Sequence, residues 1–398
     1  MQLDNLIGTY LPDCTRLLQE LVRIPSVNGE NDEGPLITYT MQRAFELGLP
    51  YETCELHGGR PNLLVGKYRK KKKGIALVAH ADTVPVGEGE ARSHDPFGGM
   101  IQDGKLYGRG AIDCKGGIAT SLYALKILQD LWYPEAAKML VGVDEESGAA
   151  SEFGIKGVLE QWFDAEGVIY TYGGSNDPSR LNIWHRGWIR ITVMCTGEEV
   201  HTWGSDWEFK RKGENAIEGI IEFIQCLQQE RPFQHLVHPY FPGYRTMFTP
   251  THISGGMWSS VVPGKAKVML DIKTLPSVDN KEVIRFIQYF AKQLSSEKKK
   301  YECKVKSSIP GVVSDQDSKF ITTVTRYMQE VHKTESVMYK GSGPANEIYL
   351  FIEKGIPAVA GFWPTGKWFH GADEYAQVAS LRQSLHALVS IALAMRSS

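Results

Sequence analysis

The feature that most restricts the fold is a pair of short, almost continuously apolar runs with a helical segment between them. The runs are Ile75–Ala79 and Met139–Val143, and such runs are typical of strands covered on both faces. Between them, Gly116–Leu128 carries apolar residues at helical spacing. Strand, helix and strand in this order predict parallel strands in an α/β sheet. We expect the amphipathic segment Ser380–Met395 to complete the same layer of helices.

A different pattern interrupts the chain from Gly187 to about Ser308. Two strand-like and two helix-like segments alternate there: Trp188–Cys195, Asn215–Gln228, Lys267–Ile272 and Lys281–Leu294. Two strand–helix units of this kind predict a compact α+β insertion. A chain of 398 residues is also long enough for more than one domain. We therefore expect a catalytic domain built from residues 1–186 and 309–398, with residues 187–308 inserted as a second domain.

Charge and cysteine content restrict the class of protein. The chain has 44 Lys and Arg against 46 Asp and Glu, a balance that gives no electrostatic reason to bind nucleic acid or an anionic membrane. No apolar run approaches the ~20 residues that span a bilayer, and the first residues lack the pattern of a secretory signal. The six cysteines are scattered without a CxxC pair, which is typical of reduced thiols in a cytosolic protein. We therefore expect a cytoplasmic protein.

A basic run stands between two apolar stretches early in the chain. Arg69–Lys73 separates Asn62–Tyr68 from Gly74–His80. We expect a hairpin turn with a solvated tip here, rather than a ligand site.

Polar residues follow both apolar runs directly. His80 and Asp82 come after the first run; being two residues apart, they project to the same side of an extended chain. One of the two side chains can bind a metal while the other orients the metal-binding side chain from behind. Asp144, Glu145 and Glu146 come after the second run, where adjacent carboxylates repel one another unless a cation offsets them. A solvated acidic loop is the alternative.

Two further loops carry candidate ligands. Asp113 lies among glycines before the helical segment Gly116–Leu128, where it could bridge two cations or simply cap the helix. His370 follows the strand-like run Ala358–Gly361 in another loop. Taken together, four loops at strand ends offer imidazole nitrogens and carboxylate oxygens, a mixture that suits zinc.

The order and spacing of these stretches resemble the cocatalytic zinc amidohydrolases and exopeptidases, a family that includes acetylornithine deacetylase, succinyl-diaminopimelate desuccinylase, aminoacylase and glutamate carboxypeptidase. The matching stretches are HADTVPVGEG, DPFGGMIQDGKLYGRGAIDCKGG, VDEESG, GEEVHTW, SGGMWSSVVPGKAKVMLDIKTLP and FHGADEY. They extend from residue 80 to residue 375. The resemblance implies a mixed, mostly parallel sheet flanked by helices, with an inserted α+β lid and dimerisation domain.

Carried over by position, the resemblance implies that His80, Asp113, Glu146 and His370 are metal ligands. Asp113 would bridge two metals, with Glu146 and His370 completing one site and His80 belonging to the other. Asp82 would hold His80 from behind. The cofactor would be zinc, one or two ions per subunit, for which cobalt or manganese can substitute. A cis peptide bond after Asp113 is also implied.

The remaining roles implied by the resemblance concern proton transfer and substrate. Glu145 would be the general base and then the general acid. His201 would reach the active site of the neighbouring subunit in a homodimer and steady the oxyanion. Lys273 and Asn346 would contact substrate. The expected reaction is hydrolysis of the C–N amide bond of a small N-acylated amino acid, as in a deacetylase or desuccinylase. Cleavage of short peptides by a carboxypeptidase or dipeptidase is the alternative. A third possibility is an inactive homologue that binds metabolites.

The sequence departs from the family pattern at two positions. Tyr172 stands where the family places a Glu or Asp ligand, so the site that holds His80 is expected to be weak, to be empty or to be filled by Tyr172 or Asp177. Lys273 stands where many members carry Arg, which binds a carboxylate with two hydrogen bonds rather than as a point charge. A substrate without a standard free α-carboxylate is therefore consistent with the sequence.

Overall fold

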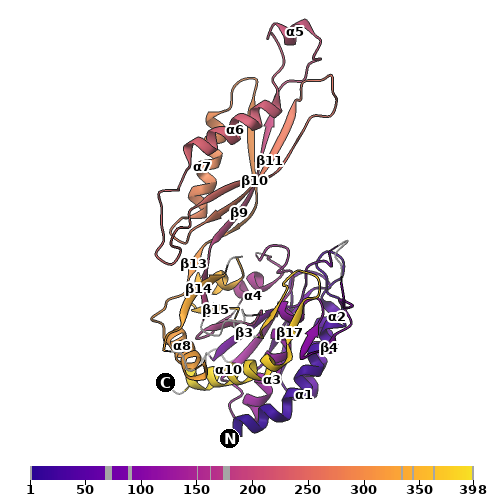
Figure 1. Cartoon of the computed structure of the whole chain (residues 1–398), viewed down its shortest axis with the longest axis vertical. Coiled ribbons are helices and arrows are strands. Elements are labelled where there is room, and N and C mark those ends of the chain that lie inside the picture. The colour runs from indigo at the N-terminus through magenta and orange to yellow at the C-terminus, as the bar shows by residue number, and fades with distance from the viewer. Residues whose placement is uncertain are drawn as a thin grey trace. The chain divides into compact units, whose positions relative to one another are not determined.

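The computed structural model describes residues 2–67, 74–87, 92–149, 151–161, 163–173, 180–332, 335–342, 345–361 and 364–396. The chain folds into two compact units, which are traced by residue number in Figure 1. Unit 1 comprises Met1–Trp184, Val313–Ser342 and Asn346–Ser398, and unit 2 comprises His185–Val312 with Gly343–Ala345.

A mixed sheet forms the centre of unit 1. Its order is β1-β2-β6-β3-β7-β15-β8-β13, with β14 paired to β8. The strands are β1 (Tyr51–Glu55), β2 (Pro61–Val65), β3 (Ile75–His80), β6 (Ala137–Gly142), β7 (Val168–Tyr170), β8 (Arg180–His185), β13 (Val312–Val313), β14 (Met338–Ser342) and β15 (Ala358–Ala360). The central strands β6, β3, β7 and β15 are parallel neighbours, whereas β1–β2, β2–β6 and β15–β8 are antiparallel. Every residue of β3 and β6 is buried, as expected for strands covered on both faces.

The predicted hairpin between the two early apolar stretches is wrong. The basic run itself lies outside the described residues, but β2 and β3 on either side of it are not neighbours, because β6 lies between them. β6 pairs antiparallel with β2 and parallel with β3. The fully buried β6 thus lies inside the sheet with a partner on each side, an arrangement that a local hairpin would prevent.

The helices of unit 1 pack against this sheet and one another. They are α1 (Gln2–Val22), α2 (Gly34–Glu46), α3 (Gly116–Asp130), α4 (Ile155–Gln161), α8 (Lys319–His332), α9 (Ile348–Ile352) and α10 (Val378–Arg396). α3 contacts β3 and β6 and lies beside α1 and α10 (Figure 1). A Cβ atom on Gly117 would lie 2.0 Å from the carbonyl oxygen of Thr171. Only glycine therefore allows the start of α3 to approach the chain after β7 so closely.

α10 is long and apolar enough to cross a membrane by length and composition alone. It instead contacts α1, α3 and α8, and most of its apolar side chains are buried among them. The apolar character of α10 is therefore explained by its position as a core helix of unit 1.

A small antiparallel sheet joins two distant parts of unit 1. Its order is β16-β17-β5-β4, with β4 (Met100–Gln102), β5 (Lys105–Tyr107), β16 (Gly366–Lys367) and β17 (Tyr375–Gln377). β5 pairs with β17, so that Tyr107 lies opposite Tyr375. This pairing brings the segment after β5 next to the loop between β16 and β17.

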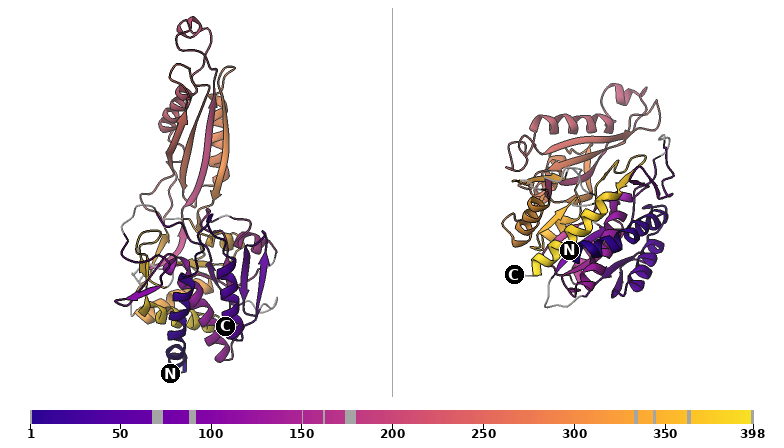
Figure 2. Two further views of the ribbon diagram at one scale, coloured as in Figure 1. Left: turned by 90° about the vertical axis from the view of Figure 1, so that its right-hand side faces the viewer. Right: turned by 60° about the horizontal axis from the view of Figure 1, so that its bottom comes forward.

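Unit 2 is an antiparallel sheet with helices packed on it. The strands β10 (Met247–Gly255), β11 (Lys265–Thr274), β9 (Gly187–Thr196) and β12 (Lys300–Ile309) lie in this order. α6 (Ala216–Glu230) and α7 (Asn280–Gln293) both pack on β9 (Figure 2), and a short α5 spans Ser205–Glu208. Asn215 and Asp279 cap α6 and α7 by accepting hydrogen bonds from backbone N–H groups of their first turns. The predicted fold class, α/β with an inserted α+β unit, is confirmed.

Candidate functional site

The candidate site lies where the parallel strands of unit 1 end. His80 is the last residue of β3, Glu145 and Glu146 follow β6, and Tyr172 follows β7. Because β3 is parallel to both β6 and β7, the carboxyl ends of these strands share one edge of the sheet, which is where open α/β sheets bind ligands.

Two other loops bring Asp113 and His370 to this edge. Asp113 lies in the segment Ala111–Lys115, just before α3, and its peptide bond to Cys114 is cis, as the resemblance implies. His370 lies between β16 and β17 and has a positive φ of 60°. The pairing of β5 with β17 holds these two segments together.

Asp113 stands between two histidines. Its Oδ1 atom lies 3.1 Å from Nε2 of His80, and its Oδ2 atom lies 3.2 Å from Nε2 of His370. Oε1 of Glu146 lies 3.3 Å from the same His370 nitrogen. Each carboxylate oxygen of Asp113 thus faces a different imidazole, which is the arrangement that a carboxylate bridging two cations requires.

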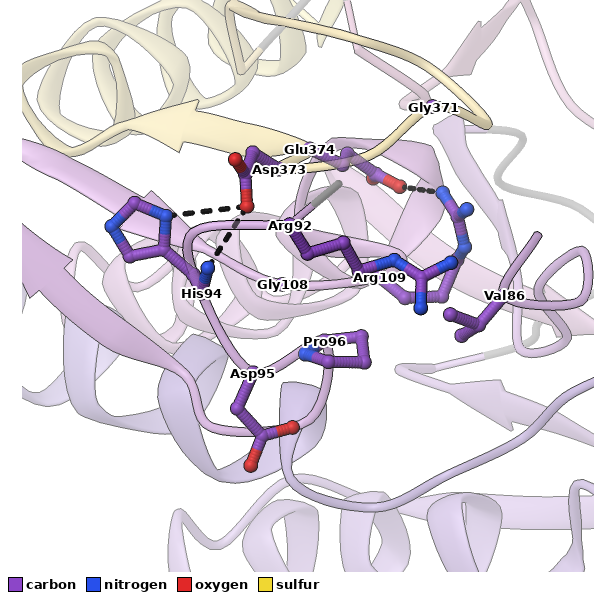
Figure 3. Close-up of a pocket in the computed structure, with 10 residues that line it drawn as sticks. All are labelled: Val86, Arg92, His94, Asp95, Pro96, Gly108, Arg109, Gly371, Asp373 and Glu374. Atoms are coloured by element: carbon purple, nitrogen blue, oxygen red, sulfur yellow. Dashed lines mark hydrogen bonds and ion pairs between the residues drawn. The ribbon is translucent and has the colours of Figure 1, made fainter. Parts of the chain in front are cut away.

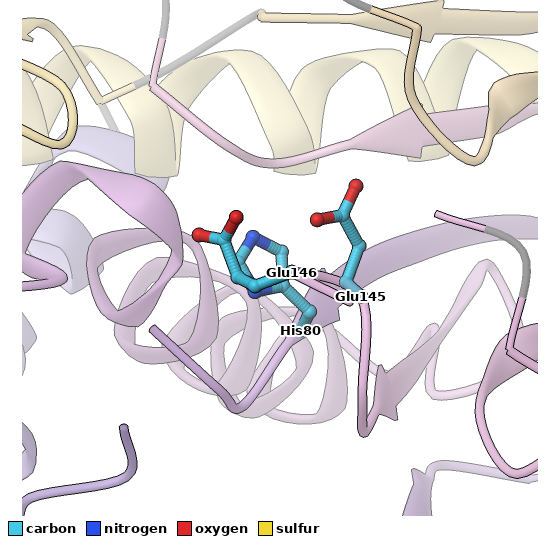
Figure 4. A group of neighbouring side chains, drawn as sticks. All are labelled: His80, Glu145 and Glu146. Carbon is cyan, nitrogen blue, oxygen red and sulfur yellow. The ribbon is translucent and has the colours of Figure 1, made fainter. Parts of the chain in front are cut away.

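The donor atoms form two groups in which each lies within 4.8 Å of the others. One group contains Asp113, Glu146 and His370, and the second contains His80, Glu145 and Glu146. Figure 4 shows the second group, whose two carboxylates come from adjacent residues and diverge from one another. Nitrogen and oxygen donors in groups of this size fit zinc or a similar divalent ion.

Asp82 is fully buried behind His80 and contacts three parts of the site. Its Oδ1 lies 3.4 Å from Nδ1 of His80. It accepts hydrogen bonds from the backbone N–H groups of Glu145 (3.1 Å) and Glu146 (2.9 Å), and from Nδ2 of Asn28 (2.6 Å). Burial opposes its charge, but the hydrogen bonds from His80 and Asn28 hold the pKa of Asp82 below its usual value. Asp82 therefore fixes both the His80 ring and the Glu145–Glu146 backbone.

A network behind Asp82 was not predicted from the sequence. Asn28 also donates to Oδ1 of Asp144 at 3.0 Å. Arg60 contacts the same oxygen at 3.0 Å and donates through Nε to Glu33 at 2.8 Å. Glu33 in turn accepts from the backbone N–H of Asp144 at 3.1 Å. These partners are far apart in the chain, and no local motif indicates their role.

A buried ion pair supports the loop that contains Asp113. Nη1 of Arg109 lies 2.6 Å from Oε2 of Glu374 (Figure 3), and both side chains are almost completely buried. Glu374 also accepts hydrogen bonds from the backbone N–H groups of Gly110, Ile112 and Asp113 at 3.1–3.3 Å. Arg109 donates to the carbonyl oxygen of His370 at 3.0 Å. One ion pair thus positions both the Asp113 and the His370 segments.

The charges of the site shift several pKa values. Hydrogen bonds with Asp113 and Glu146 raise the pKa of His370 to about 10. Burial opposes the charge on Asp113, but hydrogen bonds from His370 and His80 hold its pKa well below the usual value. Burial, together with the negative charges of Glu146 and Glu347, raises the pKa of Glu145 well above its usual value. Glu145 is therefore the carboxylate of the site best suited to gain and lose a proton.

The other predicted residues divide between the two units. Tyr172 and Asn346 lie in unit 1, where Nδ2 of Asn346 donates to the Tyr172 hydroxyl at 3.5 Å. His201 and Lys273 lie in unit 2: Nδ1 of His201 accepts from the backbone N–H of Trp203, and Lys273 pairs with Asp271 at 3.1 Å. Asp177 lies outside the described residues.

Comparison with known proteins agrees with this architecture. The family model described as peptidase family M20/M25/M40 matches residues 76–394. A succinyl-diaminopimelate desuccinylase of Methylobacterium radiotolerans is 27% identical over 391 residues, which cover 94% of this chain and 95% of that protein. The crystal structure of an M20 family metallo-carboxypeptidase from Sulfolobus solfataricus superposes with a TM-score of 0.77 at 18% identity, covering 94% of this chain and 97% of the other. The YXEP protein of Bacillus subtilis, described as a dinuclear metal binding peptidase of the M20 family, superposes with a TM-score of 0.68 at 13% identity, covering 98% and 99%.

Proposed function

Because the chain belongs to peptidase family M20/M25/M40, we propose that it is a metal-dependent amidohydrolase that cleaves the C–N amide bond of a small N-acylated amino acid. The observation that carries this proposal is the placement of Asp113 between His80 and His370, with Glu146 beside His370 and the raised-pKa carboxyl of Glu145 next to them. The relative named as a succinyl-diaminopimelate desuccinylase supports an acylated amino acid as the substrate class.

The proposed roles follow from the geometry. Asp113, Glu146 and His370 would hold one metal ion, and His80 and Asp113 would contribute to a second. When bound, zinc lowers the pKa of water and polarises a carbonyl oxygen. Asp82 keeps Nε2 of His80 directed at the site by holding the opposite side of the ring.

Glu145 carries the proton in this proposal. Its carboxylate takes a proton from the water that attacks the amide carbon, and the same carboxyl then gives a proton to the leaving amine. Burial raises the pKa of this carboxyl, which favours keeping the accepted proton on Glu145 until the second step. Its backbone, fixed by Asp82, keeps the side chain in place.

The further features are proposed on the family resemblance. The metal is zinc, one or two ions per subunit, and cobalt or manganese can replace it. The protein is a cytoplasmic homodimer formed through unit 2, in which His201 contributes to the neighbouring active site. Lys273 and Asn346 contact the substrate. The six free cysteines are consistent with a reducing compartment.

A carboxypeptidase or dipeptidase activity on short peptides is the second candidate. The similar structure from Sulfolobus solfataricus is described as a metallo-carboxypeptidase, and the same arrangement of residues can hydrolyse either kind of amide. An inactive metabolite-binding homologue, suggested by Tyr172, is the third.

The test is hydrolysis by purified protein loaded with zinc or cobalt. N-succinyl amino acids, N-acetyl amino acids and dipeptides are assayed separately by release of the free amine. Glu145→Gln should retain metal but lose about 10²–10⁴-fold in rate, which is the usual contribution of general acid–base catalysis. Glu152→Gln is the matched control, because Glu152 is an exposed carboxylate whose only ion pair among the described residues is with Lys156.

Each outcome separates the candidates. Turnover of acylated amino acids supports the proposal, and turnover of dipeptides alone supports the peptidase. Metal-loaded wild-type protein that cleaves none of them favours the inactive homologue. Loss of metal from Glu145→Gln would show that the roles of Glu145 and Glu146 are exchanged.

A further inference from the structure

One of the two proposed ion positions lacks a carboxylate that has no other proposed role. The carboxylates grouped with His80 are those of Glu145 and Glu146, which the proposed function uses as the proton carrier and as a ligand of the first ion. The first position has Glu146 and His370 in addition to Asp113. At the second, His80 and the shared Asp113 are present, but Tyr172 stands after β7 where a carboxylate ligand is expected from the family resemblance. A phenol with a pKa near 10 is neutral at pH 7 and is a poor zinc ligand. Zinc sites normally have at least three protein ligands, so the second position needs another donor.

Glu347 is a buried carboxylate that is hydrogen-bonded to the last residue of β7. It directly precedes α9, which contacts β7 and β15. Its side chain is 1% exposed. Oε2 accepts a hydrogen bond from the Tyr170 hydroxyl at 2.7 Å, and Tyr170, the last residue of β7, stacks against His80 with ring centroids 6.4 Å apart. Tyr170 therefore connects Glu347 with the histidine of the second position.

The other oxygen of Glu347 has no hydrogen-bond partner among the residues that the structure describes. Oε1 is buried and receives no hydrogen bond from the residues that the structure describes, and none of the ion pairs among these residues includes Glu347. A buried carboxylate oxygen left in this way is costly unless a proton or a cation satisfies it. Asp82 shows the contrast, because this equally buried carboxylate is hydrogen-bonded through both oxygens.

We propose that Glu347 supplies the carboxylate for the ion held by His80 and Asp113, in place of a residue following β7. This inference rests on the proposed metal-dependent function. Glu347 is not a member of either compact donor group, so its side chain must turn toward His80 when the ion binds. Its single side-chain hydrogen bond, to Tyr170, is the only such contact among the described residues that this movement has to rearrange.

Tyr172 then has a structural part. Its ring packs edge-on against Tyr170 with centroids 5.6 Å apart, and its hydroxyl accepts from Asn346, the residue before Glu347. Tyr172 thus contacts Tyr170, which is hydrogen-bonded to the Glu347 carboxylate. It also contacts Asn346, which directly precedes Glu347 in the chain. Tyr172, which stands at the expected ligand position, therefore helps to position Glu347, the proposed ligand.

The test is metal binding to stripped full-length protein, without substrate. Cobalt is titrated in by calorimetry, and visible absorption follows the cobalt spectrum as each successive equivalent binds. Wild-type protein should bind two equivalents. Glu347→Gln should keep the first and weaken the second by more than about 100-fold, beyond the 10–100-fold typical of residues that only support a ligand. Glu353→Gln, an exposed glutamate at the other end of α9, should bind both ions as wild type does.

A rescue variant distinguishes ligation from a structural effect. Glu347→Gln combined with Tyr172→Glu restores a carboxylate after β7, and it should recover the second equivalent. A single equivalent in wild-type protein, two unchanged equivalents in Glu347→Gln, or loss of both ions together would each overturn the inference. Two ions with no hydrolysis of any substrate would instead leave this inference standing and refute the proposed function.

Discussion

Replacing Asp82 by Asn tests whether one buried carboxylate organises the site. The change keeps the shape of the side chain but removes its charge and converts one oxygen into a donor. Asp82 accepts from two backbone N–H groups and from Asn28. In the variant, at least one of these donors faces the new amide NH₂ group and loses its acceptor.

The magnitude follows from these contacts. A buried donor left without an acceptor costs about 1–3 kcal/mol. The remaining hydrogen bonds lose the assistance of a charge, at about 1 kcal/mol each. We therefore expect the free energy of unfolding of metal-free Asp82→Asn to fall by about 3–5 kcal/mol. Because Asp82 also holds the His80 ring, metal affinity should fall by about 10–100-fold.

Urea unfolding of stripped protein and calorimetric metal titration measure the two effects. Asp315→Asn is the control, since Asp315 is exposed and its carboxylate accepts one local hydrogen bond, from the backbone N–H of Asp317. Unfolding within 1 kcal/mol of wild type, together with unchanged metal affinity, would refute the reasoning.

Two further predictions concern the support and the charge of the site. Glu374→Gln leaves Arg109 buried without its ionic partner, so the free energy of unfolding should fall by about 3–5 kcal/mol in urea; a loss below about 1 kcal/mol would contradict a supporting role. The pKa of His370 is raised to about 10 by Asp113 and Glu146, so the ring is protonated at pH 7 in metal-free protein and must release its proton when a metal binds. Affinity should therefore rise with pH up to about 10, and calorimetry at pH 7 in buffers of different ionisation enthalpy should detect proton release; heats that do not depend on the buffer would exclude it.

Two of the strands that the sequence predicted have uniform surroundings. β3 and β6 are covered on both faces, so their apolar runs are continuous and easily recognised. β12 has only two buried residues, Tyr301 and Ile309, and includes several lysines, so its apolar pattern is weak and the sequence did not predict it. The error at the basic run had another cause: strand order depends on pairing between distant segments, and the position of β6 between β2 and β3 is not encoded in the residues that join those strands.

The same distinction holds for the site. His80, Asp113, Glu146 and His370 stand in recognisable local stretches, and the structure brings their side chains together. Asn28, Arg60 and Glu33 act through contacts that span 27 to 116 positions, and no local pattern marks them. Glu347 is intermediate: it ends a loop that loosely follows the family pattern, but its hydrogen bond with Tyr170, 177 positions away, is visible only in the folded chain.

The most direct test of the central claim is the location of metal in the protein. Crystals grown with zinc, measured at wavelengths on either side of its absorption edge, show where the ions bind. We expect an ion at about 2.0–2.2 Å from donor atoms of Asp113, Glu146 and His370, and a second ion in contact with His80 and Asp113. Zinc bound elsewhere, with these four side chains contacting no ion, would contradict the account.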